Sequence, residues 1–209
     1  MENGKIEKKA NYEKKIDVVF CGLIREKERF KKSINDLILL RKQGFVNQII
    51  LSTWDYEAKN NPEMVEFLEK NKVLIIASKE PADRGWGNIW CQMKSLEYGL
   101  NKIDENRFVL RTRTDVWINP EFIKKLAVEK EELLKITNNL PKGNKFKFKI
   151  WIPWYELTLP FYVADECFFG LCKDSKLLVN YNTEYDNKLK VDSGISHIRK
   201  SIDPFLKDY

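Results

Sequence analysis

Along the first two thirds of the chain, short apolar runs alternate with stretches in which apolar residues recur every three or four positions. The apolar runs have the length of buried strands and cover residues 16–22, 48–54, 73–77 and 107–114. The periodic stretches have the spacing of amphipathic helices and cover residues 26–41, a short segment after Asn61-Pro62, 88–103 and 120–135. This alternation predicts right-handed βαβ units, and therefore an α/β fold with a mostly parallel sheet flanked by helices.

The last third of the chain has a less regular pattern. Strands are predicted over residues 148–154 and 161–171, after a basic loop at 141–149, and a helix is predicted from Lys173 onward. We expect residues 16–209 to form a single domain with an irregular C-terminal third, behind a flexible, Lys-rich arm of residues 1–15.

Composition and charge limit the classes of partner. The 209 residues are 43% hydrophobic and 33% charged, as in a globular protein, and the net charge is +6. Part of that charge lies in the N-terminal arm, and elsewhere no basic stripe is interleaved with aromatic residues, so we expect no nucleic-acid partner. The start of the chain lacks the apolar region of a signal peptide, and no run approaches the ~20 apolar residues of a spanning helix. We therefore expect a cytoplasmic protein, with the arm as a candidate for peripheral contact with the inner membrane.

Several common catalytic motifs are absent from the sequence. There is no P-loop, GxGxxG, GxSxG or HExxH motif. A Ser-His-Asp hydrolase would have to use the single histidine, His197, and no nucleophile elbow supports that class. The four cysteines lack the spacing of a zinc site and are predicted to be reduced core thiols.

Polar residues and glycine follow three of the predicted strands. The candidates for binding a donor nucleotide and its phosphates are Gly22, Arg25, Ser52, Trp54, Asp55 and Arg113. Because the carboxyl ends of parallel strands meet at one edge of a sheet, these residues are expected to line one crevice. Glycine lets backbone approach a ligand, arginine binds phosphate, and tryptophan stacks on a base. The alternatives are a turn glycine at 22, a core tryptophan at 54 and a helix cap at 55.

The helix predicted over 88–103 carries a polar, uncharged stripe beside its apolar one. Asn88, Gln92, Ser95 and Gly99 fall on one face. This stripe predicts a face turned toward a polar cleft, and the preceding Arg84 lies close to a helix N-terminus, which favours anions. Arg84, Asn88 and Gln92 are therefore further candidates for binding the nucleotide and its phosphates. The alternative is a cap at Asn88 and a small-residue packing face at Ser95 and Gly99.

Two further groups lie in the C-terminal third. Asp165 and Glu166 are adjacent in a predicted strand and point to opposite faces, so one of them can serve a cleft as general base. His197 and Arg199 lie near a glycine and are candidate metal and phosphate ligands, respectively. The alternatives are an exposed or ion-paired carboxylate and a structural histidine.

Asp115 ends the fourth predicted strand beside Arg113. One carboxylate flanked by arginines is suited to a divalent cation, Mn²⁺ or Mg²⁺, and to the phosphates that the cation binds. We therefore predict Asp115 as a metal ligand, together with His197, the candidate ligand from the C-terminal third.

The order of these motifs resembles that of the WavE-type lipopolysaccharide-synthesis family of glycosyltransferases. The matching segments span about residues 16–205 and include 50–54, 88–100, 111–115, 165–170 and 197–205. The resemblance implies a GT-A-like, Rossmann-like fold and a nucleotide-sugar transferase in surface-polysaccharide assembly, acting on a glycan or lipid-linked glycan acceptor. It also implies a divalent metal bound by a short acidic motif after a central strand. This chain departs from the Asp-x-Asp form of that motif, because Arg113 replaces its first aspartate.

The implied reaction needs the leaving diphosphate neutralised and the acceptor hydroxyl deprotonated. We assign the first task to Asp115 with its metal, helped by Arg113, His197 and Arg199. Asp165 or Glu166 would perform the second, which implies inversion, although a retaining outcome stays open. Two alternatives remain: a sugar nucleotidyltransferase, and a degenerate transferase domain that binds nucleotide or glycan without turnover.

Overall fold

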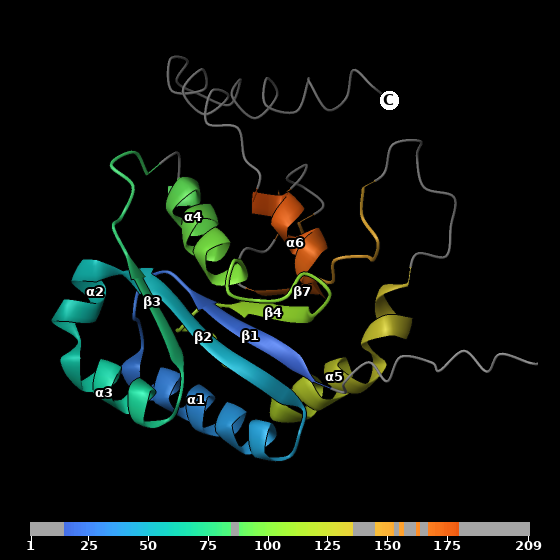
Figure 1. The fold of residues 1–209 in the computed structure, drawn as a ribbon, viewed down its shortest axis with the longest axis horizontal. Coiled ribbons are helices and arrows are strands. Elements are labelled where there is room, and N and C mark those ends of the chain that lie inside the picture. Colours follow the sequence, from blue (N-terminus) through green and yellow to red (C-terminus); the bar gives the residue numbers. More distant parts are fainter. Residues whose placement is uncertain are drawn as a thin grey trace, which may run out of the picture.

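The protein is a three-layer α/β molecule in the computed structural model, which describes residues 15–84, 88–135, 145–152, 155–156, 162–163 and 167–179. A five-stranded sheet lies between helices on both of its faces (Figure 1). The elements in chain order are β1 (Ile16–Cys21), α1 (Lys27–Lys42), β2 (Val46–Trp54), α2 (Asp55–Asn60), α3 (Pro62–Lys70), β3 (Leu74–Ser78), α4 (Ile89–Leu100), β4 (Phe108–Thr112), α5 (Pro120–Leu134), β5 (Tyr155–Glu156), β6 (Tyr162–Val163), β7 (Cys167–Leu171) and α6 (Cys172–Val179).

The strand order of the sheet is β3-β2-β1-β4-β7. The first four strands are parallel, and β7 pairs antiparallel with β4. The chain runs outward from β1 to β3 and then returns to place β4 on the other side of β1. The direction of winding therefore reverses between β1 and β4, and ligands of open α/β sheets bind outside the carboxyl ends of the strands at such a point. The predicted α/β fold with a mostly parallel central sheet is confirmed.

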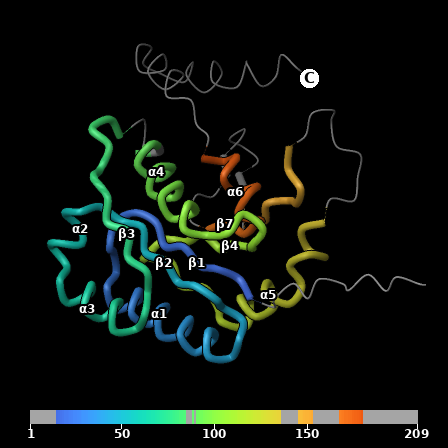
Figure 2. Tube along the Cα trace, viewed as in Figure 1, coloured from blue at the N-terminus to red at the C-terminus, as the bar shows by residue number. Residues whose placement is uncertain are grey.

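Each face of the sheet has its own apolar core. Helices α1, α3 and α5 cover one face, and α4 and α6 cover the other, as Figures 1 and 2 show. Gly99 brings α4 close to β1, because a Cβ at this position would lie 2.6 Å from Cγ1 of Val19. The end of the α4 stripe is thus a small-residue packing face, as the alternative interpretation held.

The predicted elements of the first two thirds are all present, with shifted ends. The helix expected over 88–103 ends at Leu100, and the short helix α2 was not predicted. All four cysteines are buried and free, which confirms the predicted core thiols. Burial raises the pKa of Cys21 and of Cys172 to about 11, so both are protonated at neutral pH. Within the described residues, no helix is both long enough and apolar enough to cross a membrane.

The prediction of a strand over 148–154 is wrong for residues 148–152, which are the part of that range that the structure describes. Trp151 makes one isolated bridge with Phe169, through backbone hydrogen bonds of 2.8 and 2.9 Å. Part of the reason lies at the start of the segment, where the buried carboxylate of Asp174 accepts from the backbone amide of Phe148 at 2.7 Å and from that of the preceding Lys147 at 2.9 Å. Those amides are thereby withdrawn from a strand ladder. The strand predicted over 161–171 is represented by β6 and β7, and residues 164–166 lie outside the described residues.

Candidate functional site

A pocket of about 220 Å³ lies at the point where the winding of the sheet reverses. Its walls come from the loops after β1 and β4, the end of β2, the segment after β3 and the first turn of α4. The described residues that line it are Cys21, Gly22, Leu23, Arg25, Trp54, Tyr56, Glu80, Arg84, Asn88, Cys91, Gln92, Arg111, Arg113 and Asp115. Four of them are arginines and two are carboxylates, so the pocket is electropositive.

Gly22 forms the floor of the pocket at the end of β1. Its φ of +95° is in a region that side chains rarely adopt, which explains glycine at this position. The amide of Gly22 donates to the carbonyl oxygen of Ser52 and to Oγ of Ser95, each at 2.9 Å. The backbone after β1 is therefore fixed against both β2 and α4.

Thr114 joins the loop after β4 to the loop after β1. Its fully buried hydroxyl donates to the carbonyl oxygen of Leu23 and accepts from the amide of Arg25, both at 2.8 Å. A carboxylate on α2 also holds the loop after β1, because Glu57 accepts from the amide of Ile24 at 2.9 Å. These bonds fix the direction from which Arg25 enters the pocket.

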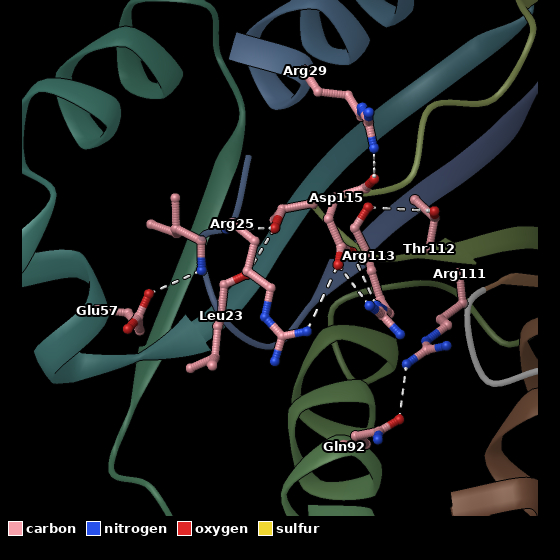
Figure 3. Close-up of polar contacts among 11 residues, drawn as sticks. Leu23, Arg25, Arg29, Glu57, Gln92, Arg111, Thr112, Arg113 and Asp115 are labelled. Atoms are coloured by element: carbon pink, nitrogen blue, oxygen red, sulfur yellow. Dashed lines mark hydrogen bonds and ion pairs between the residues drawn. The ribbon is translucent and has the colours of Figure 1, made fainter. Parts of the chain in front are cut away.

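Asp115 is the centre of a cluster of arginines (Figure 3). Nε and Nη2 of Arg113 donate to the two carboxylate oxygens of Asp115 at 2.9 and 2.6 Å, and Nη1 of Arg25 lies 3.7 Å from Oδ2. Arg29 donates to the backbone carbonyl oxygen of Asp115 at 3.0 Å. The hydrogen bonds from Arg113, with the charges of Arg113 and Arg25, hold the pKa of Asp115 below its usual value although partial burial opposes this. Asp115 is therefore ionised at neutral pH.

The residues around Asp115 do not fit a divalent cation. Both carboxylate oxygens already accept from Arg113, and the other carboxylate of the pocket, Glu80, pairs with Arg84 at 2.9 Å. No group of three or more His, Cys, Asp and Glu side chains is arranged for a metal in the part of the chain that the structure describes. Hard cations bind several oxygen ligands, whereas here three guanidinium groups surround one carboxylate and its carbonyl. The prediction of Mn²⁺ or Mg²⁺ therefore depends on residues outside that part, which include His197.

Arg111 forms the inner wall of the pocket. It lies on the face of β4 that α4 covers, and it is 4% exposed. Its Nη2 is 3.5 Å from Oε1 of Gln92, a long contact, and its buried Nε has no hydrogen-bond partner (Figure 3). Among the described residues, no carboxylate forms an ion pair with it.

Most of the predicted binding residues meet at this pocket. Lining positions are occupied by Gly22, Arg25, Trp54, Arg84, Asn88, Gln92, Arg113 and Asp115. Trp54 is 2% exposed, so its ring belongs largely to the core, in agreement with the alternative interpretation.

Ser52 and Asp55 are placed differently from the prediction. Ser52 is fully buried, and its hydroxyl donates to the carbonyl oxygen of Ser95 at 2.6 Å, so it joins β2 to α4 and does not reach a ligand. Asp55 is exposed in the first turn of α2 and is not among the lining residues. Asp165, Glu166, His197 and Arg199 lie outside the described residues.

Sequence reasoning assigned no role to several residues that form the site. Tyr56, Glu80, Cys91 and Arg111 line the pocket, and Thr114 joins its two loops. One signal was present, because Val109, Arg111 and Arg113 alternate along a strand and so share a face. The hydroxyl bridge of Thr114 has no signature in sequence.

Neither models of known protein families nor curated protein sequences give a match to this chain. The geometry and charge of the pocket are therefore the basis for its functional assignment.

Proposed function

We propose that this protein is a glycosyltransferase that moves a sugar from a nucleotide-sugar donor to a glycan or lipid-linked glycan acceptor in bacterial-type surface-polysaccharide biosynthesis. The observation that carries the proposal is the set of four arginines at the winding-reversal point of the sheet. A GT-A-like fold is part of the proposal, supported by the parallel strands β3, β2, β1 and β4 with the antiparallel β7 beside them.

The arginines are suited to the diphosphate of such a donor. Guanidinium groups bind phosphate oxygens in a bidentate manner, and their planar forks orient the group they hold. The pocket volume of about 220 Å³ is below the 300–1,000 Å³ that encloses drug-sized ligands. The diphosphate is therefore the part of the donor that the pocket would enclose, while the nucleoside and the sugar extend from it.

In the proposed reaction, an acceptor oxygen forms a bond to the anomeric carbon of the sugar. The bond from that carbon to the diphosphate oxygen breaks, and the leaving nucleoside diphosphate keeps the electron pair. Arg25, Arg84, Arg111 and Arg113 stabilise the charge that develops on this leaving group. The proton of the acceptor passes to a general base, for which Asp165 and Glu166 stay the candidates.

A second candidate function is a domain that binds a nucleotide or glycan without turnover. The ion pair between Arg113 and Asp115 favours it, since an arginine occupies the place of an acidic metal ligand and engages both oxygens of the carboxylate that remains. The two functions share the pocket and differ only in the chemical step.

Donor consumption separates these two functions. Purified protein is incubated with UDP-, GDP-, CDP- and ADP-sugars, with Mn²⁺ or with EDTA, and released nucleoside diphosphate is measured, with water or an added glycan as acceptor. We expect nucleoside diphosphate to be released from one donor class. The rate of release should fall at least about 10-fold in Arg113→Gln, because one charge-assisted contact is lost. The rate should be unchanged in Arg41→Gln, a control remote from the pocket. Binding of a nucleotide without release of any diphosphate would establish the second function instead.

A further inference from the structure

The charge of Arg111 is not balanced within the described part of the protein. The other three arginines of the pocket each have a carboxylate: Arg113 and Arg25 share Asp115, and Arg84 pairs with Glu80. Arg111 is the most deeply buried of the four, and its partners are neutral. Its Nη2 lies 3.5 Å from Oε1 of Gln92, and it also hydrogen-bonds to Cys21, whose pKa burial raises to about 11. A buried charge is unfavourable unless it is paired and hydrogen-bonded, so this wall is suited to a bound anion.

The position of Arg111 indicates where such an anion would bind. The side chain occupies the inner wall between β4 and α4, and Gln92 in the first turns of α4 lines the same wall (Figure 3). The first turn of α4 contains no acidic residue, and the N-terminal end of a helix favours negative charge. An anion bound here would meet Arg111 from the sheet, Asn88 and Gln92 from α4, and Arg113 and Arg25 from the two loops.

We propose that Arg111 binds the diphosphate of the donor directly, and that this site neutralises the diphosphate with guanidinium groups in place of a divalent cation. The inference rests on the proposed function for the diphosphate and its nucleotide, whereas the preference for an anion over a cation is argued from the pocket itself. Asp115 is then a positioning residue that holds Arg113 and Arg25 toward the pocket.

A cation at Asp115 would be opposed by its surroundings. It would have to displace Arg113 from both carboxylate oxygens and would then lie among the guanidinium groups of Arg25, Arg29 and Arg113. Like charges at such separations repel strongly in a partly buried site. An anion in the pocket gains from Arg25, Arg113 and Arg111, which all line it.

Isothermal calorimetry of the full chain tests the inference with two probes, inorganic pyrophosphate and a panel of nucleoside diphosphates. Each probe is titrated in EDTA and again with Mn²⁺. We expect pyrophosphate and at least one nucleoside diphosphate to bind in EDTA. Because this comparison uses the unaltered protein, it does not depend on the folding of any variant.

Variants at Arg111 identify the group responsible. Arg111→Gln is expected to weaken binding in EDTA by at least about 30-fold, as for loss of a buried charged contact. Arg111→Lys retains the charge without the planar fork, and its affinity is expected to lie between those of the unaltered protein and Arg111→Gln. Arg41→Gln is the matched control: it removes the same charge from a guanidinium that donates to the carbonyl oxygens of Asn71 and Lys72, and affinity should not change.

The outcomes separate this inference from the proposed function. Binding of nucleoside diphosphate only with Mn²⁺, unaltered in Arg111→Gln, would overturn the inference and leave the transferase intact. Binding of pyrophosphate in EDTA that needs Arg111, without consumption of any nucleotide sugar, would support the inference and remove the transferase. Absence of binding by every probe, or equal losses in Arg111→Gln and Arg41→Gln, would overturn the inference.

Discussion

The arginines at the two ends of the β1–β4 strand pair differ in their partners: Arg107 pairs with a buried carboxylate, whereas buried Arg111 has none among the described residues. At the amino end, Nε of Arg107 donates to Oδ2 of Asp17 at 2.6 Å, and this carboxylate is 1% exposed. Asp17 also accepts from the side-chain amide of Asn47 and the backbone amide of Gln48. At the carboxyl end, on the same face of the sheet, Arg111 has no carboxylate among the described residues.

This difference separates a structural charge from a functional one. A charge that the fold satisfies internally stabilises the native state only through the pair, and loss of one partner is costly. A charge that the fold leaves unsatisfied destabilises the free protein and is stabilised when a ligand arrives. The pocket therefore lies at the end of the strand pair where the charges are out of balance.

Methionine substitution of Arg107 and Arg111 provides the sharpest contrast. Arg107→Met leaves the carboxylate of Asp17 buried without its charge partner and is expected to lower the free energy of unfolding by about 3 kcal/mol. Arg111→Met removes an unpaired buried charge and is expected to leave the stability unchanged or increased. Equilibrium urea denaturation measures both. Equal losses would show that Arg111 is as well satisfied as Arg107.

A threonine pair tests how the carboxyl end is held together. Thr114→Val removes a buried hydroxyl that bonds to Leu23 and Arg25, and the expected loss is about 2 kcal/mol. Thr112→Val is the matched control, since that buried hydroxyl makes only a 3.5 Å contact with the carbonyl oxygen of Arg113. If the two variants unfold at the same urea concentration, the bridge between the loops contributes nothing.

Alanine substitutions at two glycines with similar backbone conformation distinguish an effect on stability from an effect on ligand binding. Gly22 and Gly44 have φ of +95° and +84°, and a Cβ at either position would meet nothing within 4 Å. Alanine at either is expected to cost roughly 1 kcal/mol of stability through backbone strain alone. Only Gly22→Ala should also weaken nucleoside diphosphate binding, because only Gly22 lines the pocket. Equal affinities of the two variants in calorimetry would remove Gly22 from the site.

The charge of Asp115 gives the smallest expected effect, and it depends on pH. The pKa of Asp115 is lower in the folded protein than its ordinary value of 3.8, mainly through its hydrogen bonds with Arg113. Its contribution to stability is therefore fully present above that ordinary value and is lost as the pH falls through the folded pKa. Asp115→Asn is expected to lose about 1 kcal/mol at pH 7. The gap should begin to narrow as the pH falls below 3.8 and should close below the folded pKa. A gap that does not narrow as the pH falls below 3.8 would show that the effect of the substitution is not electrostatic.

Sequence reasoning reached the pocket through the ends of strands. Apolar runs located β1, β2 and β4, and the rule for parallel sheets then brought Gly22, Arg25, Arg113 and Asp115 to one edge. Helical periodicity placed Asn88 and Gln92 in the same region.

The features that the sequence did not predict depend on contacts between segments that are distant in the chain. The structural role of Ser52 depends on its reciprocal bonds with Ser95, 43 residues away in the chain. The strand expected over 148–154 is prevented partly by Asp174, 26 residues beyond Phe148. The role of Arg111 emerges only once α4 covers it and the absence of a nearby carboxylate among the described residues is visible. Local pattern carries none of this information.

The central claim is that the carboxyl edge binds a nucleoside diphosphate through its arginines. Thermal unfolding with UDP, GDP, CDP, ADP and CMP, each in EDTA and in Mn²⁺, tests it most directly for the unaltered protein and for Arg111→Gln. A ligand at 100 times its Kd stabilises the native state by about 2.7 kcal/mol, equivalent to a rise in midpoint of roughly 5–10 °C for a chain of this size. We predict such a rise with one diphosphate in EDTA, reduced to about a third or less in Arg111→Gln because its affinity is expected to be at least about 30-fold lower. No rise with any nucleotide, or a rise that requires Mn²⁺ and persists in Arg111→Gln, would contradict the claim.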